Sequence, residues 1–358
     1  MPINNVGYRS WDGAKRGAFS RCLTIASTGV EIAFKSRWLR RILLLSWLPV
    51  IYVGSGFFFF EKYMDEQIRQ TIQIIEAKNK LDVTRAVREA RTEFRSHQQK
   101  QDLPTGELRG ALSLFPKSEL VLKSILNDAP SVARHTTWCW MLMFFFQYPQ
   151  GVSMIIMIGL IVPPLISRDL RSRAYLMYFS RPIGRLEYLL GKLAIPATFL
   201  AMITLIPAMT IYVFGIMLSP GFSVVLDTWD VPFRIVIASA VLIIPTSLLA
   251  LMFSSLTHES RFAAFAWLAV WGLGEGAYRA LSLSQFDPKT LPSGAPAPQQ
   301  ITDWSFVSLF GTVARVQEWV FGLESNLFVT LPFICILVAV SVVSAIILFN
   351  RVTAPINA

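Results

Sequence analysis

The chain has 358 residues, of which 53% are hydrophobic and only 16% charged, and its formal net charge is +10. Soluble domains carry about 25% charged residues, so this composition excludes an ordinary soluble protein. The basic residues lie beside long apolar runs. We therefore attribute the positive charge to membrane orientation and lipid headgroups, and we expect no nucleic-acid partner.

Long runs without Lys, Arg, Asp or Glu recur along the chain. Roughly 20 apolar residues in a helix cross the hydrocarbon core of a bilayer. We therefore expect an all-α, polytopic membrane protein with about six transmembrane helices. The expected spans are 42–60, 138–166, 193–218, 233–256, 262–283 and 326–350. The fifth crossing requires Glu275 and Arg279 to lie in or near the membrane.

The distribution of basic residues predicts the orientation. The segment 1–41 and the loop 167–192 both carry many more basic than acidic residues, so we place them in the cytoplasm, together with the tail 351–358. The segment 61–137 is placed outside, because it is long and its charges nearly cancel. These assignments predict a multi-pass protein of the inner (plasma) membrane with both termini cytoplasmic.

Three segments outside the spans have amphipathic patterns. Residues 19–38 mix apolar and basic side chains, which predicts a helix in the cytoplasmic interface before the first span. The segment 61–137 repeats apolar residues at helical spacing. It is either a self-packed helical cap or a functional element, namely a docking surface for an extracytoplasmic protein or a lid over an exit path. The loop 284–325 predicts an amphipathic helix resting on the outer leaflet.

The loop 167–192 contains the most informative pattern. It is a short helix, a break at Ser180-Arg181-Pro182, and the start of a new helix in which Ser180 caps and Pro182 occupies the first turn. A rigid basic element between two spans suits the transmission of a push from a soluble partner. The same arginines would also serve simply to fix the orientation, and the residues alone leave both interpretations open.

The order of residues in this loop resembles the cytoplasmic loop between the second and third spans of type-2 ABC exporter permeases. The shared pattern is an acidic residue, a basic cluster, a Leu/Tyr-rich helix and then Ser-Arg-Pro-Ile-x-Arg-x-Glu-Tyr-Leu-Leu-Gly-Lys. Asp169 stands where the family often has Glu, and Arg171 and Arg173 replace a commoner step of small residues. The six-span layout and the interfacial helix also fit the family.

The resemblance implies a permease subunit that pairs with a second copy or a paralogue and with a cytosolic ABC ATPase. It implies that residues 175–179 form part of a coupling helix that docks on the ATPase. The ATPase-coupling residues are expected to be Asp169, Arg171, Arg173, Tyr175, Tyr178, Phe179, Arg181, Pro182, Arg185 and Glu187. The chain contains no Gly-x-x-x-x-Gly-Lys-Ser/Thr phosphate loop, so ATP and Mg would be bound by the partner and no cofactor by this chain.

Polar residues inside the expected spans are candidates for a second site. Glu275 and Arg279 are four residues apart, so they would lie on one helix face and either neutralise each other or serve function. Gln147, together with Tyr148, Pro149 and Gln150, interrupts the second span, which is too long for one straight crossing. We expect a kink, a tilt or an interfacial start there.

Two other functions remain to be weighed. A membrane-embedded enzyme would need an acid/base or metal constellation, and the three histidines show no such spacing, so we expect no catalytic residues and no metal site. A scaffold or mechanotransmitter with the same fold but without transport stays open, because the segment 61–137 would suit the passage of a signal to a partner. The identity of any substrate does not follow from the sequence.

Overall fold

The computed structural model describes residues 17–62, 120–121, 124, 130–172, 184–219, 223–284 and 304–353. Within these residues all regular structure is helical, which confirms the predicted all-α fold class. Most of the segment 61–137 lies outside the described residues, so its predicted helices stay predictions.

Five helical stretches in the described residues are long and apolar enough to cross a membrane. They are Arg37–Lys62, Ser131–Arg171, Arg185–Leu218, Val231–Leu256 and Leu327–Val352. They coincide with the first, second, third, fourth and sixth expected spans. The helix α15 (Ser260–Ser284) has 25 residues and would be about 37 Å long, but it is not apolar enough to join this group. The fifth crossing therefore stays a prediction.

The regular α-helix of the second span is interrupted where polar residues occur in its sequence. It consists of α7 (Pro130–Phe145), the π-helix η1 (Phe146–Gln150), α8 (Gly151–Ile161) and α9 (Pro163–Arg171). Pro149 lies inside η1, and a proline cannot donate the backbone hydrogen bond that a regular α-helix needs there. The π-helix lies at the polar interruption of the span. Because 41 continuous helical residues would be about 60 Å long, the expected kink, tilt or interfacial start stays a prediction.

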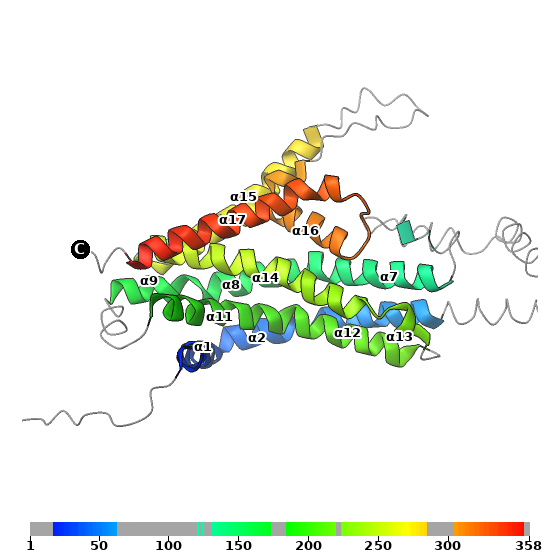
Figure 1. Cartoon of the computed structure of the whole chain (residues 1–358), viewed down its shortest axis with the longest axis horizontal. Coiled ribbons are helices and arrows are strands. Elements are labelled where there is room, and N and C mark those ends of the chain that lie inside the picture. Colours follow the sequence, from blue (N-terminus) through cyan, green and yellow to red (C-terminus); the bar gives the residue numbers. More distant parts are fainter. Residues whose placement is uncertain are drawn as a thin grey trace, which may run out of the picture.

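The helix α14 (Val231–Leu256) is central, and helices of the second and third spans, α15, α16 and α17 pack against it (Figure 1). The third span consists of α11 (Arg185–Ile203) and α12 (Leu205–Leu218), and the short α13 (Ser223–Asp227) leads into α14. The last helix, α17 (Leu327–Thr353), packs along α14. The first span begins with α2 (Arg37–Leu45), and α1 (Ala18–Phe34) packs on α11. Figure 1 shows α1 lying across the long axis of the bundle, as expected for an interfacial helix.

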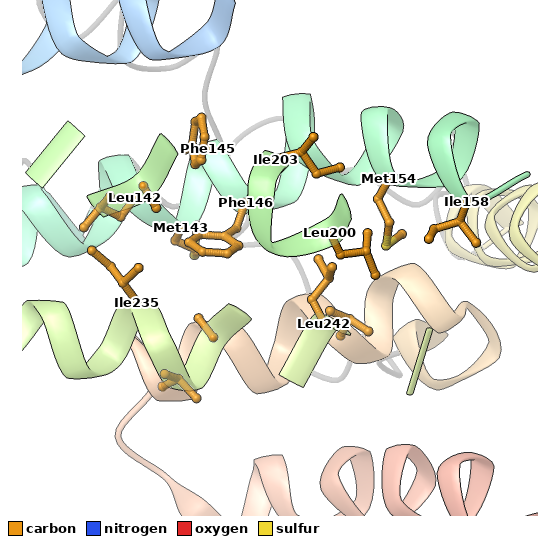
Figure 2. Close-up of a cluster of buried hydrophobic side chains, with 14 of the residues drawn as sticks. Leu142, Met143, Phe145, Phe146, Met154, Ile158, Leu200, Ile203, Ile235 and Leu242 are labelled. Carbon is orange, nitrogen blue, oxygen red and sulfur yellow. The ribbon is translucent and has the colours of Figure 1, made fainter. Parts of the chain in front are cut away.

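The core is formed by large apolar side chains where the second, third and fourth spans meet. Figure 2 shows this layer, with Phe146 and Met154 from the second span, Leu200 from α11 and Leu242 from α14. All four are almost completely buried. In contrast, the first span and α17 expose many large apolar side chains, including Ile51, Phe59 and Phe328. Such faces are typical of helices that contact lipid or another membrane helix.

The helix α16 (Leu309–Val320), which follows the 3-10 helix η2 (Trp304–Val307), differs from the expectation of a helix resting on the outer leaflet. It packs against α14, α15 and α17. Its apolar stripe of Val313, Val316 and Val320 is buried. The amphipathic pattern correctly predicts a helix. The apolar face of this helix is covered by protein, because α15 and α17 leave space for the helix beside α14.

Candidate functional site

Two ends of the bundle carry clustered charges. We call the end formed by α1, α9 and the start of α11 the loop end, because residues 173–183 connect its helices. We call the opposite end, formed by the end of the first span, the start of α7, α13 and the start of α14, the far end. The two lie at opposite ends of the long axis in Figure 1.

At the loop end, Asp169 joins the end of α9 to the start of α11. Its carboxylate accepts a hydrogen bond from the Tyr188 hydroxyl at 2.7 Å and forms an ion pair with Lys192 at 2.8 Å. The Lys192 ammonium also donates to the backbone carbonyl of Leu165 at 2.9 Å. Tyr188 and Lys192 are buried. The two helices that flank residues 173–183 are therefore held together by charge-assisted bonds shielded from water.

Glu187 connects α11 to α1. One carboxylate oxygen contacts the Arg21 guanidinium of α1 at 2.9 Å, and the other accepts from the backbone N–H of Gly184 at 3.1 Å. The second contact caps the first turn of α11. Close packing extends this junction, because a Cβ added to Gly191 would lie 2.8 Å from the Ile25 side chain.

Of the other predicted coupling residues, only Arg171 and Arg185 lie in the described part of the chain. Arg171 forms an exposed ion pair with Glu259 at 3.4 Å, which links α9 to the turn before α15. Arg185 lies half-buried in the first turn of α11. Six predicted residues lie outside the described part of the chain, namely Arg173, Tyr175, Tyr178, Phe179, Arg181 and Pro182.

The three intramembrane polar candidates line one cavity, which we call the side cavity. It has a volume of about 940 Å³ and lies between the second span, α15 and α16. Gln147, Glu275 and Arg279 all line it, although Gln147 is far from the other two in sequence. Arg315 and Glu318 of α16 add charges that sequence reasoning missed.

The polar groups of the side cavity are mostly paired. Glu275 contacts Arg279 at 2.8 Å and accepts a hydrogen bond from the Ser308 hydroxyl at 3.0 Å. Arg315 and Glu318 form a second ion pair at 3.2 Å. The indole N–H of the buried Trp271 has no hydrogen-bond partner among the described residues. An acceptor inside the cavity would satisfy that donor.

The far end contains a buried cluster of charges that was not predicted. Glu61, at the end of the first span, contacts Arg134 at 3.2 Å and accepts a hydrogen bond from the Trp138 indole at 2.9 Å. Arg134 also contacts Asp227 of α13 at 3.2 Å. The side chains of Glu61 and Arg134 are 1% and 7% exposed, respectively. This cluster fixes the first and second spans to the segment before α14.

A neighbouring group at the far end is centred on Asp230. Its carboxylate contacts His135 at 3.0 Å and Arg234 at 2.6 Å, and Arg234 donates to the backbone carbonyl of Val320 at 2.7 Å. Partial burial alone would raise the pKa of Asp230. The hydrogen bond from Arg234 and the charges of His135 and Arg234 outweigh burial, so the pKa of Asp230 lies below its ordinary value of 3.8. This group joins α7, α14 and the end of α16.

The two charged ends connect helices from different parts of the chain. No group of three or more His, Cys, Asp or Glu residues in the described parts of the chain could hold a metal ion. The loop end connects the interfacial helix with two consecutive spans, and the far end connects the first, second and fourth spans. A displacement at one end would therefore move whole helices.

One comparison with known proteins gives a match. The family model described as "ABC-2 family transporter protein" matches residues 33–354. No curated protein and no solved structure matches the chain. The matched range contains all five candidate membrane helices, α9 and α11 of the loop end, and both far-end groups, but only the last two residues of α1. With a match over most of its length, the chain belongs to the ABC-2 family of transporter proteins and is a multi-pass membrane component of an ABC transporter.

Proposed function

We propose that the chain is the permease subunit of an ABC exporter, driven by a separate cytosolic ATPase and paired with a second copy or a paralogue. ATP and Mg would be bound by the ATPase, because the sequence has no phosphate loop of its own. The loop end would face the ATPase, and residues 173–183 would form the contact.

The observation that carries this proposal is the bonding of Asp169 to both Tyr188 and Lys192. These contacts close the base of the loop 173–183, so a push on the loop cannot move α9 without moving α11. Ion pairs that are largely shielded from water are weakly screened and keep their geometry better than exposed ones. The loop would thus act on the second and third spans as one unit.

The interfacial helix would move with this unit. Arg21 and Glu187 connect α1 to α11, and α1 packs closely along α11. A tilt of α11 would therefore shift α1 against the membrane surface. The coupled element would comprise α1, α9 and α11, all of which meet at the loop end.

The side cavity is the proposed chamber for the transported molecule. It combines apolar walls, such as Val152 and Leu268, with the charged pairs of α15 and α16. A molecule with both apolar and polar parts would match these walls. The free indole N–H of Trp271 would donate to an acceptor on such a molecule.

Copurification tests the ATPase assignment. We expect the tagged chain, purified from its native membrane in mild detergent, to bring down a protein with a Walker nucleotide-binding motif. Charge reversal by Arg181→Glu or Arg185→Glu should lower the amount of copurified ATPase several-fold. Arg351→Glu is the matched control, because Arg351 is an exposed arginine in the last turn of α17. Absence of any ATPase from the wild-type preparation would contradict the proposal.

A second experiment tests the side cavity separately. Glu275→Gln should leave ATPase copurification unchanged but alter the response of ATP hydrolysis to added solutes or lipids in proteoliposomes. Glu31→Gln serves as the control, since Glu31 is exposed on α1 and does not line the side cavity. Identical responses of Glu275→Gln and wild type to every solute that stimulates the complex would remove the cavity from the transport path.

A further inference from the structure

A second cavity lies at the loop end, under the interfacial helix. We call it the α1 cavity. It has a volume of about 560 Å³ and is enclosed by α1, the start of α2, the junction of α8 and α9, and α11. It is separate from the side cavity and shares no lining residue with it. The charge pairs of the loop end form one part of its rim.

The cavity has an apolar interior. Its apolar wall is made by residues such as Leu39, Leu160, Ile161 and Ile195, of which Leu39, Ile161 and Ile195 are buried and Leu160 is exposed. Arg168 lies eight residues after Leu160, which places it about 10 to 12 Å closer to the end of the bundle. The lining therefore changes from apolar to charged along the bundle axis. Water would find few hydrogen-bond partners in the deeper part.

The rim of the cavity is positively charged. Lys192 and Asp169 line it but form an ion pair with each other. Arg168 also lines it and is exposed, and it forms no ion pair with any of the described residues. The hydroxyl groups of Thr28 and Ser36 lie on the α1 side of the rim. The rim thus presents one uncompensated cation with hydroxyl groups near it.

The cavity opens at the level where three candidate spans end. The first span begins at Arg37, the second ends at Arg171 and the third begins at Arg185. Ser36 and Arg168 on the rim are within three residues of two of these ends. In a bilayer whose headgroups reach these helix ends, the charged rim would lie at the boundary between the hydrocarbon core and the headgroups, and the apolar wall would reach into the hydrocarbon layer.

We propose that the α1 cavity binds one anionic phospholipid of the leaflet at the loop end. An acyl chain would fill the apolar part against Leu160 and Ile195, and the phosphate would contact Arg168. A phospholipid is the molecule that presents an apolar chain and an anion at this spacing in a membrane. Its charge complements the single free cation on the rim.

The bound lipid would add contacts between α1 and α9, both of which line the cavity. On its other side α1 is already fixed to α11 by the pair of Arg21 and Glu187. A lipid between α1 and α9 would complete the packing of the loop end. This role does not depend on whether the chain transports a solute.

Native mass spectrometry of the full-length protein tests the site. The protein is purified in mild detergent and titrated with phosphatidylglycerol or, separately, with phosphatidylcholine. We expect one phosphatidylglycerol molecule to be retained by the wild type, and at least fivefold less retention of phosphatidylcholine. Arg168→Gln should lower phosphatidylglycerol retention at least fivefold. Arg171→Gln is the matched control, since Arg171 is an exposed arginine on the same helix that does not line the cavity.

Filling the cavity tests the acyl-chain part. Thr28 is exposed and lines the cavity, so Thr28→Trp should exclude the chain and lower retention to the level of Arg168→Gln. Ser27→Trp, at an exposed neighbour outside the lining, should retain the lipid. Inorganic phosphate at millimolar concentration should fail to displace the lipid. Retention of phosphatidylglycerol by both Arg168→Gln and Thr28→Trp at the wild-type level would overturn the proposal, and so would displacement by inorganic phosphate.

Discussion

The loop end and the far end of the bundle are both held by charges, but in different ways. At the loop end, Asp169 and Lys192 lie close in sequence and connect two consecutive spans across a short loop. At the far end, Glu61 and Arg134 come from distant segments and are more deeply buried. The loop end contains partly accessible pairs around a proposed contact for a motor. The far end contains a fixed junction of the first, second and fourth spans.

This difference assigns the two ends different mechanical roles. Buried pairs are costly to break because each partner would be left as an unpaired charge away from water. The pair of Asp169 and Lys192 is also largely shielded but less deeply buried, so water can reach its separated groups more easily and its loss should cost less. We therefore expect the far end to act as the rigid anchor of the bundle and the loop end as its adjustable part. Substitutions at the two ends test whether the far end is the more rigid one.

The largest effect should come from Arg134→Ala. The substitution leaves Glu61 buried with only the Trp138 hydrogen bond, and we expect a loss of about 3–5 kcal/mol in the free energy of unfolding. Unfolding in mixed micelles by titration with dodecyl sulfate measures it. Lys62→Ala, at an exposed neighbour of Glu61, is the control. A loss below about 1 kcal/mol would show that the cluster is not an anchor.

Lys192→Met should have a smaller effect, about 2 kcal/mol in the same assay, because Asp169 keeps the hydrogen bond from Tyr188. Methionine retains most of the apolar stem of the lysine, so the packing is little changed. In a complex with its ATPase, the variant should hydrolyse ATP with a weaker response to solute. Destabilisation as large as that of Arg134→Ala would erase the proposed difference between the two ends.

The Asp230 group predicts a dependence on pH at the far end. The folded-state pKa of Asp230 is lowered, so its contribution to stability is fully present above the ordinary value of 3.8 and is lost as the pH falls below that value. Asp230→Asn should therefore be less stable than the wild type at neutral pH. The difference should shrink as the pH falls below about 4. Unfolding curves of both proteins between pH 3 and 7 measure it, and a constant difference would contradict the assignment.

The smallest effect should come from Arg171→Ala. Its ion pair with Glu259 is long and exposed on both sides, so we expect a change within about 0.5 kcal/mol. The same micelle titration measures it. A loss comparable to that of Lys192→Met would mean that α9 is held mainly through the α14–α15 turn, and the coupled unit would have to include α15.

Much of the fold follows from the sequence because apolar runs report membrane crossing directly. Five of the six expected spans match helices that can cross a membrane, and the polar interruption near Gln147 matches η1. The position of α16 does not follow, because an amphipathic stripe does not say whether lipid or protein covers it. The fifth span stays a prediction, since Glu275 and Arg279 make α15 too polar to qualify by composition.

The candidate sites also contain some features that the sequence predicts and others that it does not. The pairing of Glu275 with Arg279 follows from their spacing on one helix. Their meeting with Gln147 in the side cavity depends on the packing of α15 against α8 and α16, which the sequence does not specify. The far-end cluster was missed for the same reason. Glu61 and Arg134 each border an apolar run, and that is the only sequence signal that marks them.

The proposed contact with a cytosolic ATPase places the loop end on the cytoplasmic side of the membrane and the far end on the opposite side. Single cysteines at Ser172 and Leu226, in a chain whose three native cysteines are replaced by serine, test this directly. Both positions are exposed, Ser172 at the loop end and Leu226 in α13 at the far end. In intact cells, a membrane-impermeant maleimide should label Leu226→Cys at once and Ser172→Cys only after permeabilisation. Labelling of Ser172→Cys in intact cells would contradict the cytoplasmic position of the loop end.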